Sequence, residues 1–299
     1  MVRSVLRKLR GSQPFNYVAT TVVKSLCGLR GATPESVVRR LPRVGTVHTR
    51  LPDGRTLRLW SFGDDFVANE VFWKGWDGYE PETTPVFYRL AREAGVVLDV
   101  GAHVGYYSLL AAMANPAGRV LAFEPLPKAV ERFRLNVRAN GLSNVELVEC
   151  AVGDSTGTAT FFHMPTDAAG VPSSSGLSAR FFGLPFFVES GVTSKTEVNV
   201  CTLDEVLAER GVGRVGLIKV DTETTEPAVF EGALATLERD HPDLIFEVLP
   251  GQGTAPALSR LLEPLGYTFY LLRDTGPERR DSIEDHAEWW NYLARHEGR

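Results

Sequence analysis

The chain has 299 residues, of which 43% are hydrophobic and 23% are charged, and this ordinary globular composition excludes disorder as the dominant state. Its 32 basic and 37 acidic side chains give a formal net charge of -5, so no global basic field favours nucleic acid as a partner. The length allows either two domains or one α/β domain with an accessory segment.

The three cysteines, Cys27, Cys150 and Cys201, are odd in number and widely spaced. No second cysteine or histidine stands at zinc-ligand spacing, so the sequence indicates neither a disulfide framework nor a zinc site. Cysteines of this kind fit a reducing compartment, and we expect the protein to be cytoplasmic.

Residues 1–43 alternate short helical stretches with Gly, Pro and Thr breaks. Four basic residues near the start are not followed by an unbroken apolar segment, which argues against a signal peptide, and no run of about 20 apolar residues predicts a membrane span. The weakly amphipathic residues 2–9 fit a short packing or solvated helix better than a helix on a membrane surface.

Residues 44–61 form two alternating segments around Pro52-Asp53-Gly54-Arg55, and an Asp-Gly pair in this setting predicts a β-hairpin. We therefore expect residues 1–85 to form a helical segment and hairpin cap. The remaining residues, 86–299, are expected to form the main domain, with an insertion at about 163–195 where the regular pattern stops.

From residue 96 onward, short apolar runs alternate with helical patterns, which is typical of a mostly parallel, doubly wound α/β sheet. The predicted strands are residues 96–100, 120–123, 145–150, 217–220, 244–248 and 267–271. Three helical faces lie between them, in residues 130–137, 229–237 and 258–265.

The first candidate site follows the first predicted strand. Asp99 stands near the strand's end, and Gly101 and Gly105 allow close approach of a ligand to a helix N-terminus. The glycine spacing does not fit the nicotinamide fingerprint Gly-x-Gly-x-x-Gly, and an acid near the strand end suits a ligand that bears an amine.

Two further acids follow the next two strands. Glu124 stands at the end of the second strand, where a carboxylate accepts hydrogen bonds from ribose hydroxyls in doubly wound sheets. Asp154 follows the third strand and is a candidate for the adenine amino group, although a solvated turn residue is an equally good interpretation. Acids at three successive strand ends together predict a nucleoside site.

Over about residues 76–271, the chain resembles the FkbM-type S-adenosylmethionine-dependent methyltransferases. The matching pieces are residues 99–108, 122–125, 136, 140–141, 151–154, 202–204 and 218–223. The resemblance implies a Rossmann-like class I methyltransferase fold and an S-adenosyl-L-methionine cofactor. It also implies methyl transfer to a hydroxyl of a sugar, glycolipid or polyketide-like natural product, and it adds His103, Tyr79 and Glu80 as residues near the cofactor.

Asp221 and Glu223 are the candidate catalytic residues, because this fold presents catalytic groups at the carboxyl ends of its strands. They would act as a base, hold the acceptor hydroxyl or bind a divalent ion, although no metal site is indicated. A helix cap and a surface charge are the alternative interpretation. Thr224 and Thr225 replace the glycine and small residue usual in the family, which narrows the acceptor pocket or marks a lapsed active site.

The candidate acceptor-binding residues are Tyr79, Ser174, Ser175 and Glu247. His163 and His241 are interpreted as structural. Two other functions stay open, a nicotinamide-dependent oxidoreductase and a methyltransferase-like binding module without activity. The sequence does not indicate an oligomeric state or the identity of the acceptor.

Overall fold

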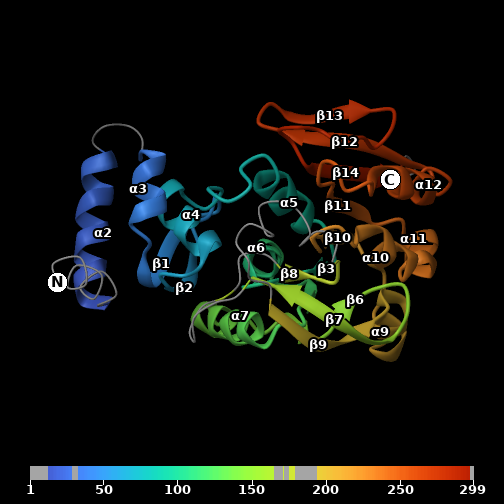
Figure 1. Cartoon of the computed structure of the whole chain (residues 1–299), viewed down its shortest axis with the longest axis horizontal. Helices are drawn as coiled ribbons and strands as arrows, with labels where there is room; N and C mark the ends of the chain where they lie inside the picture. The colour runs from blue at the N-terminus through green and yellow to red at the C-terminus, as the bar shows by residue number, and fades with distance from the viewer. Residues whose placement is uncertain (1–12, 29–32, 165–170, 172–174, 179–193, 297–299) are drawn as a thin grey trace.

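The computed structural model describes residues 13–28, 33–164, 171, 175–178 and 194–296. Its N-terminal part consists of α2 (Gln13–Gly28), α3 (Glu35–Arg40), β1 (Val44–Arg50), β2 (Thr56–Phe62) and α4 (Phe66–Lys74). Strands β1 and β2 pair in antiparallel fashion from Val44–Phe62 to Arg50–Thr56, which confirms the predicted hairpin. Figure 1 shows this part at one end of the molecule.

Two asparagines of helix α7 (Pro127–Asn140) dock the hairpin onto the rest of the protein. The Asn136 side chain accepts a hydrogen bond from the Trp60 amide at 2.7 Å and donates one to the Val104 carbonyl at 2.8 Å. Asn140 exchanges two hydrogen bonds with the Arg58 backbone. Because each side chain satisfies the exposed backbone edge of β2, the hairpin becomes an extension of the main body.

The main sheet has eight strands in the order β13-β12-β14-β11-β10-β3-β4-β5. Its central strands are parallel, whereas β14 pairs in antiparallel fashion with both β11 and β12, and β12 with β13. The strands are β3 (Val96–Val100), β4 (Arg119–Phe123), β5 (Val145–Val148), β10 (Leu217–Val220), β11 (Asp243–Glu247), β12 (Tyr267–Arg273), β13 (Gly276–Arg280) and β14 (Asn291–His296). The predicted mostly parallel, doubly wound sheet is therefore confirmed, with an antiparallel edge.

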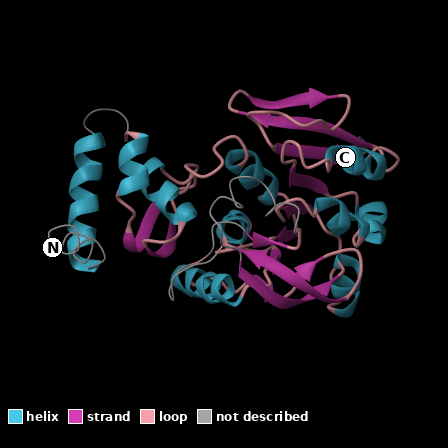
Figure 2. Cartoon of the chain, in the orientation of Figure 1, coloured by secondary structure: helices cyan, strands magenta, loops and turns pink. Residues whose placement is uncertain are grey.

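Successive residues of the buried strands serve opposite faces of this sheet. In β3, Val97 packs with helices α5 and α6, whereas Leu98 packs with the helices on the other face, and Ile245 and Leu244 of β11 divide in the same way. The helices are α5 (Thr84–Ala91), α6 (Tyr106–Ala114), α9 (Leu203–Glu209), α10 (Glu226–Glu231), α11 (Leu234–Asp240) and α12 (Ala255–Leu262). Figure 2 shows that β12, β13 and β14 form the edge of the molecule away from α2.

The helical pattern over residues 229–237 forms two helices, α10 and α11, where the periodicity predicts one face. Gly232 lies at the break, and a Cβ atom there would come within 2.1 Å of the Gly153 carbonyl oxygen. Close backbone contact with the segment after β6 therefore interrupts the helix.

A second, four-stranded sheet has the order β6-β9-β7-β8. Its strands are β6 (Ala151–Val152), β7 (Gly157–His163), β8 (Ser175–Gly176) and β9 (Ser194–Cys201). Most of the insertion expected at about 163–195 lies outside the described residues.

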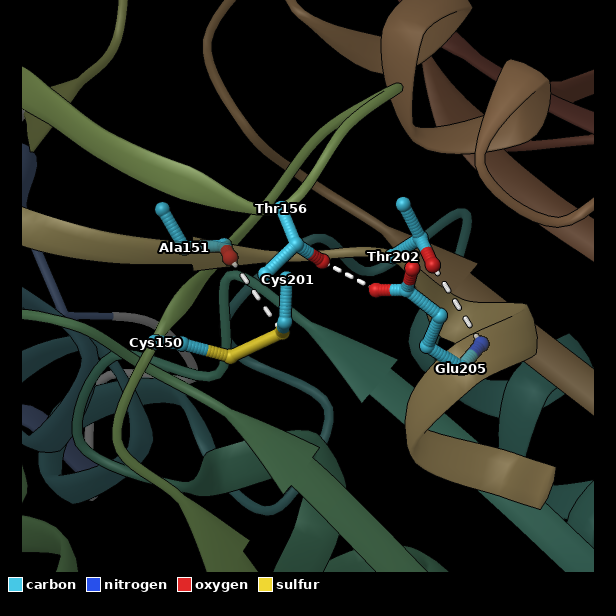
Figure 3. Close-up of a disulfide and its surroundings, with 6 residues drawn as sticks. All are labelled: Cys150, Ala151, Thr156, Cys201, Thr202 and Glu205. Carbon is cyan, nitrogen blue, oxygen red and sulfur yellow. Dashed lines mark hydrogen bonds between the residues drawn. A yellow bond between two sulfur atoms is a disulfide. The ribbon is translucent and has the colours of Figure 1, made fainter. Parts of the chain in front are cut away.

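The structure contains a disulfide between Cys150 and Cys201, so the expectation that no disulfide is present was wrong (Figure 3). Strands β6 and β9 are parallel neighbours with Ala151 opposite Val200, which brings the two cysteine Cα atoms to 6.3 Å. A separation of 51 residues hides this pairing in the sequence. The inference of a reducing compartment loses its basis.

Among the helices that the structure describes, none has the length and apolar character needed to cross a membrane. The weakly amphipathic residues 2–9 lie outside the described residues. The division of the chain at residue 85 stays a prediction.

Candidate functional site

The chain changes direction across the sheet between β3 and β10. From β3 it continues to β4 on one side, while β10 pairs with β3 on the other. Open α/β sheets bind ligands outside the carboxyl ends of their strands at such a switch point. A cavity lies here, and Gly101, Glu124 and Asp221, which follow three adjacent strands, line it together.

Gly101 permits a close crossing of two loops at this edge. Its φ is +80°, and a Cβ atom would lie 1.9 Å from the Asp221 carbonyl oxygen. Gly105 has a φ of +88°, but its missing Cβ makes room for the Phe133 ring, at 2.6 Å. Gly105 is not among the residues that line the cavity, and its contact with a ligand stays a prediction.

Glu124 is buried, and its carboxylate is held by two backbone amides. The amide of His103 donates to Oε2 at 2.9 Å, and that of Leu126 donates to Oε1 at 2.8 Å. Burial raises the pKa of Glu124, and the His103 side chain and the two amides oppose that shift. Glu124 and His103 both line the cavity, so the cavity contains a carboxylate whose orientation is already fixed.

Asp99 lies beneath the cavity, in a smaller adjoining pocket that Gly101, His103 and Asp221 also line. It is 2% exposed and accepts a hydrogen bond from the Ser108 hydroxyl at 2.5 Å. Burial raises the pKa of Asp99 to about 6, so this carboxyl is poised to interact with a positive group.

Asp154 lies apart from this cluster. It is exposed after β6 and accepts a hydrogen bond from the Ser155 hydroxyl at 2.8 Å. It does not line the cavity, whereas Cys150, Ala151 and Val152, just before it, do. Cys150 and strand β6 therefore form this wall of the cavity, and contact of Asp154 with a cofactor stays a prediction.

A buried lysine, which the sequence reasoning did not select, links the acids of the site. Lys219 of β10 is 1% exposed, and its Nζ lies 2.9 Å from Asp221 Oδ2 and 3.9 Å from Glu80 Oε2. The same atom lies 4.4 Å from the centre of the Tyr107 ring, and the Tyr107 hydroxyl donates to Glu80 at 2.5 Å. A lysine inside an apolar strand run was the signal available, since a buried charge requires partners.

The loop after β10 adopts an unusual backbone. Glu223 and Thr224 have φ angles of 57° and 88°, a region that β-branched residues rarely occupy. Glu226 supports the loop, because its Oε1 accepts hydrogen bonds from the Thr222 amide and hydroxyl and from the Thr224 amide at 3.0–3.3 Å. Burial raises the pKa of Glu226 to about 7.

The predicted acceptor residues divide between two pockets. Ser175 lines the cavity at the strand ends, and Tyr79 lines both this cavity and a second pocket of about 630 Å³. Glu80 and Glu247 line only the second of these. Burial and the neighbouring acids, Asp221 first among them, raise the pKa of Glu247. Ser174 lies outside the described residues.

The two histidines lie away from both pockets. His163 contacts the Thr196 hydroxyl at 3.1 Å within the small sheet, and His241 stacks on His296 with the ring centres 3.9 Å apart. Within the described ranges, no group of three or more His, Cys, Asp or Glu side chains is arranged to hold a metal ion.

Comparison with known proteins gives a match to the family model "Methyltransferase FkbM domain" over residues 99–298. The chain is 29% identical over 249 residues to the 31-O-demethyl-FK506 methyltransferase FkbM of Streptomyces tacrolimicus, covering 75% of this chain and 90% of that protein. It is 28% identical over 214 residues to the methyltransferase sdnD of Sordaria araneosa, covering 64% of this chain and 76% of that protein.

Among solved structures, the chain is similar to a methyltransferase FkbM from Methylobacillus flagellatus. The TM-score is 0.43 at 16% identity, with 68% of this chain and 44% of the other covered. The sequence match over residues 99–298 carries the comparison, because it includes the ends of β3, β4 and β10 that build the cavity.

Proposed function

Because the chain belongs to the FkbM methyltransferase family, we propose that it transfers a methyl group from S-adenosylmethionine to a hydroxyl of a small molecule. The observation that supports this proposal best is the convergence of Gly101, Glu124 and Asp221 on one cavity from three adjacent strands. A doubly wound sheet binds a nucleoside-containing ligand at this place.

The chemistry of the cavity fits an adenosyl cofactor. Glu124 would accept hydrogen bonds from the ribose hydroxyls, since backbone amides already fix its orientation. Ala151 and Val152 would cover the apolar face of the adenine. Asp99 lies where the ammonium group of the methionine part would need a carboxylate, and Gly101 keeps the backbone beside it free of a side chain.

When bound, the cofactor supplies a methyl group on a cationic sulfur, and its transfer to oxygen leaves a neutral thioether. The residues of the chain must align the acceptor hydroxyl and remove its proton. Asp221 is the residue that we assign to the proton, with Glu223 beside it at the edge of the cavity. Lys219 is a positioning residue, because its ammonium group holds one oxygen of Asp221 at 2.9 Å.

The acceptor in this proposal is a hydroxyl of a sugar, glycolipid or polyketide-like natural product. The name of the Streptomyces tacrolimicus relative describes a methyltransferase for 31-O-demethyl-FK506, which supports an oxygen as the methyl acceptor. The same edge of the sheet presents carboxylates, which suit an alcohol because an alcohol needs a proton acceptor.

Calorimetry with S-adenosylhomocysteine and with NAD tests the cofactor. We expect saturable binding of S-adenosylhomocysteine and none of NAD, and the reverse result would favour the nicotinamide-dependent oxidoreductase. Transfer of a labelled methyl group into a broad set of hydroxylated metabolites then tests activity. Cofactor binding without any labelled product would support the inactive binding module.

A further inference from the structure

The second pocket, of about 630 Å³, adjoins the cavity at the strand ends, because Tyr79 lines both. Helix α4, the segment before α5, Glu247 of β11 and the residues before β14 all contribute to its walls. Tyr79 lines both spaces, so the two pockets share a wall. A molecule in the second pocket would therefore lie next to the site of methyl transfer proposed above.

Carboxylates dominate the lining of this pocket. Six are present among its lining residues, namely Glu70, Asp77, Glu80, Glu82, Glu247 and Glu288. The one basic residue in that lining, Lys74, is already paired with Glu70 and lies 3.3 Å from Glu35. The buried Lys219 nearby is committed to Asp221 and Glu80. The negative charge of the pocket is therefore not balanced by the described residues of the chain.

Three buried oxygen atoms in the lining lack a hydrogen-bond donor among the described residues. They are Glu70 Oε1, Glu247 Oε2 and Asn291 Oδ1. The residues Glu70 and Asn291 are each only 4% exposed, and Asn291 pairs directly with Glu247 across β11 and β14. A buried acceptor without a donor is destabilising, so these atoms favour a ligand that brings N–H or O–H groups.

Two aromatic rings at the pocket stay open to solvent. Phe66 is 56% exposed and Trp290 is 43% exposed, and both line the pocket. An aromatic face attracts a cation through its quadrupole and also packs against the apolar C–H face of a ring compound. Exposed rings beside unbalanced carboxylates thus suit a ligand that is both cyclic and positively charged.

We propose that this pocket binds the methyl acceptor, and that the acceptor is a hydroxylated ring compound carrying a protonated amine, such as an amino sugar. The proposal rests on the function proposed above and names its substrate class. Glu247 and Asn291 accept hydrogen bonds from the ammonium group and a neighbouring hydroxyl, and Trp290 covers the ring. Phosphorylated or carboxylated acceptors are excluded by the six carboxylates.

A matched set of sugars tests this specificity. Binding of glucosamine, N-acetylglucosamine, glucose and glucose 6-phosphate is measured by calorimetry with saturating S-adenosylhomocysteine present. We expect glucosamine to bind at least about tenfold more tightly than the neutral sugars and glucose 6-phosphate not to bind. Equal binding of glucosamine and glucose, or binding of none of the four, would overturn the proposal.

Two variants locate the effect. Glu247→Gln should remove most of the preference for glucosamine over glucose, and the control Glu209→Gln, at an exposed position of α9, makes the same substitution without affecting it. Binding of S-adenosylhomocysteine to each variant reports an intact cofactor cavity. If wild-type protein binds S-adenosylhomocysteine but shows no amine preference, the inference fails while the proposed function stands. If it does not bind S-adenosylhomocysteine, the proposed function fails.

Discussion

Two loops leave the same edge of the main sheet, one after β3 and one after β10, and both contain residues with positive φ. In the loop after β3, three residues have a positive φ, and two of them are glycines, Gly101 and Gly105, while the third is His103. The loop after β10 places Glu223 and Thr224 in this region. The first loop adopts its shape at little cost, whereas each strained residue in the second costs on the order of 1–3 kcal/mol.

A buried glutamate supports each loop at its non-glycine position. Glu124, just after the neighbouring strand β4, accepts a hydrogen bond from the His103 amide. Glu226, at the start of helix α10, accepts hydrogen bonds from the amides of Thr222 and Thr224. The loop after β3 therefore has no space for added side-chain atoms at its glycines. The shape of the loop after β10 instead depends on a carboxyl group that must stay buried. Changes in the two loops should differ in kind as well as in size.

Gly101→Ala should have the largest effect. The added Cβ atom would lie 1.9 Å from the Asp221 carbonyl oxygen, so the two loops must separate. We expect binding of S-adenosylhomocysteine and methyl transfer to fall below detection, measured by calorimetry and by a labelled-methyl assay. Gly157→Ala is the control, because a Cβ atom there meets nothing within 4 Å. Normal affinity in Gly101→Ala would contradict the crossing described here.

Asp221→Asn should act on chemistry more than on binding. Loss of a positioned proton acceptor lowers turnover by about 10²–10⁴-fold, whereas the affinity for S-adenosylhomocysteine should stay within a few-fold. Steady-state kinetics and calorimetry measure the two quantities. Near-normal turnover would move the assignment to another residue, with His103, which lines the cavity, the next to test. Loss of wild-type activity on chelation would indicate a route through a bound cation.

Glu226→Gln should change how stability depends on pH. The pKa of Glu226 is raised from 4.5 to about 7 by burial, so between these values the folded chain keeps a proton that the unfolded chain releases. The free energy of unfolding therefore falls as pH rises through this window, by on the order of 3 kcal/mol for this group. Urea denaturation at pH 4.5 and pH 7.5 should show a smaller fall in Glu226→Gln.

Glu231→Gln on the exposed side of the same helix is the control for that experiment. Asp99, whose pKa is raised to about 6, contributes with the same sign in every variant, so the comparison between variants isolates Glu226. An unchanged pH dependence in Glu226→Gln would show that Glu226 is not protonated in the folded chain.

Thr224→Gly should have the smallest effect, and it should be stabilising. Glycine adopts a φ of 88° without strain, so the free energy of unfolding should rise by roughly 1 kcal/mol after the larger entropy of the unfolded chain is included. Thr225→Gly, at a φ of -105°, should instead destabilise the protein. The urea midpoint measures both, and destabilisation by Thr224→Gly would disprove strain at this residue.

Local patterns were sufficient to predict the hairpin and the parallel strands, because apolar periodicity and an Asp-Gly turn act over a few residues. Strands β13 and β14 were not predicted, since Gly276–Arg280 has no apolar alternation and Asn291–His296 is inserted between β11 and β12 by long-range pairing. The convergence of Gly101 and Glu124 at one edge of the sheet was predictable from the acids and glycines at the strand ends. The role of Gly105 was not, because Phe133 reaches it from another helix.

The remaining features of the site depend on burial, which a sequence does not state. Lys219 is a site residue because it contacts three neighbours from different elements. Glu226 is one because it accepts hydrogen bonds from backbone amides of the preceding loop. Asp154 shows the same dependence on burial, since its carboxylate follows the expected strand but is exposed, a fact that the sequence does not give. The family's residue pattern thus predicted the edge of the sheet more accurately than it predicted the contacts of each side chain.

The bond between Cys150 and Cys201 closes the intervening chain into a covalent ring. A protease that cuts one peptide bond within this ring opens it without releasing either piece, because the disulfide still joins them. A nicked protein would therefore migrate as one species on a gel without reductant and as two fragments after reduction. Since Cys150 also lines the cavity at the strand ends, the nicked protein would keep that wall joined to Cys201 of β9.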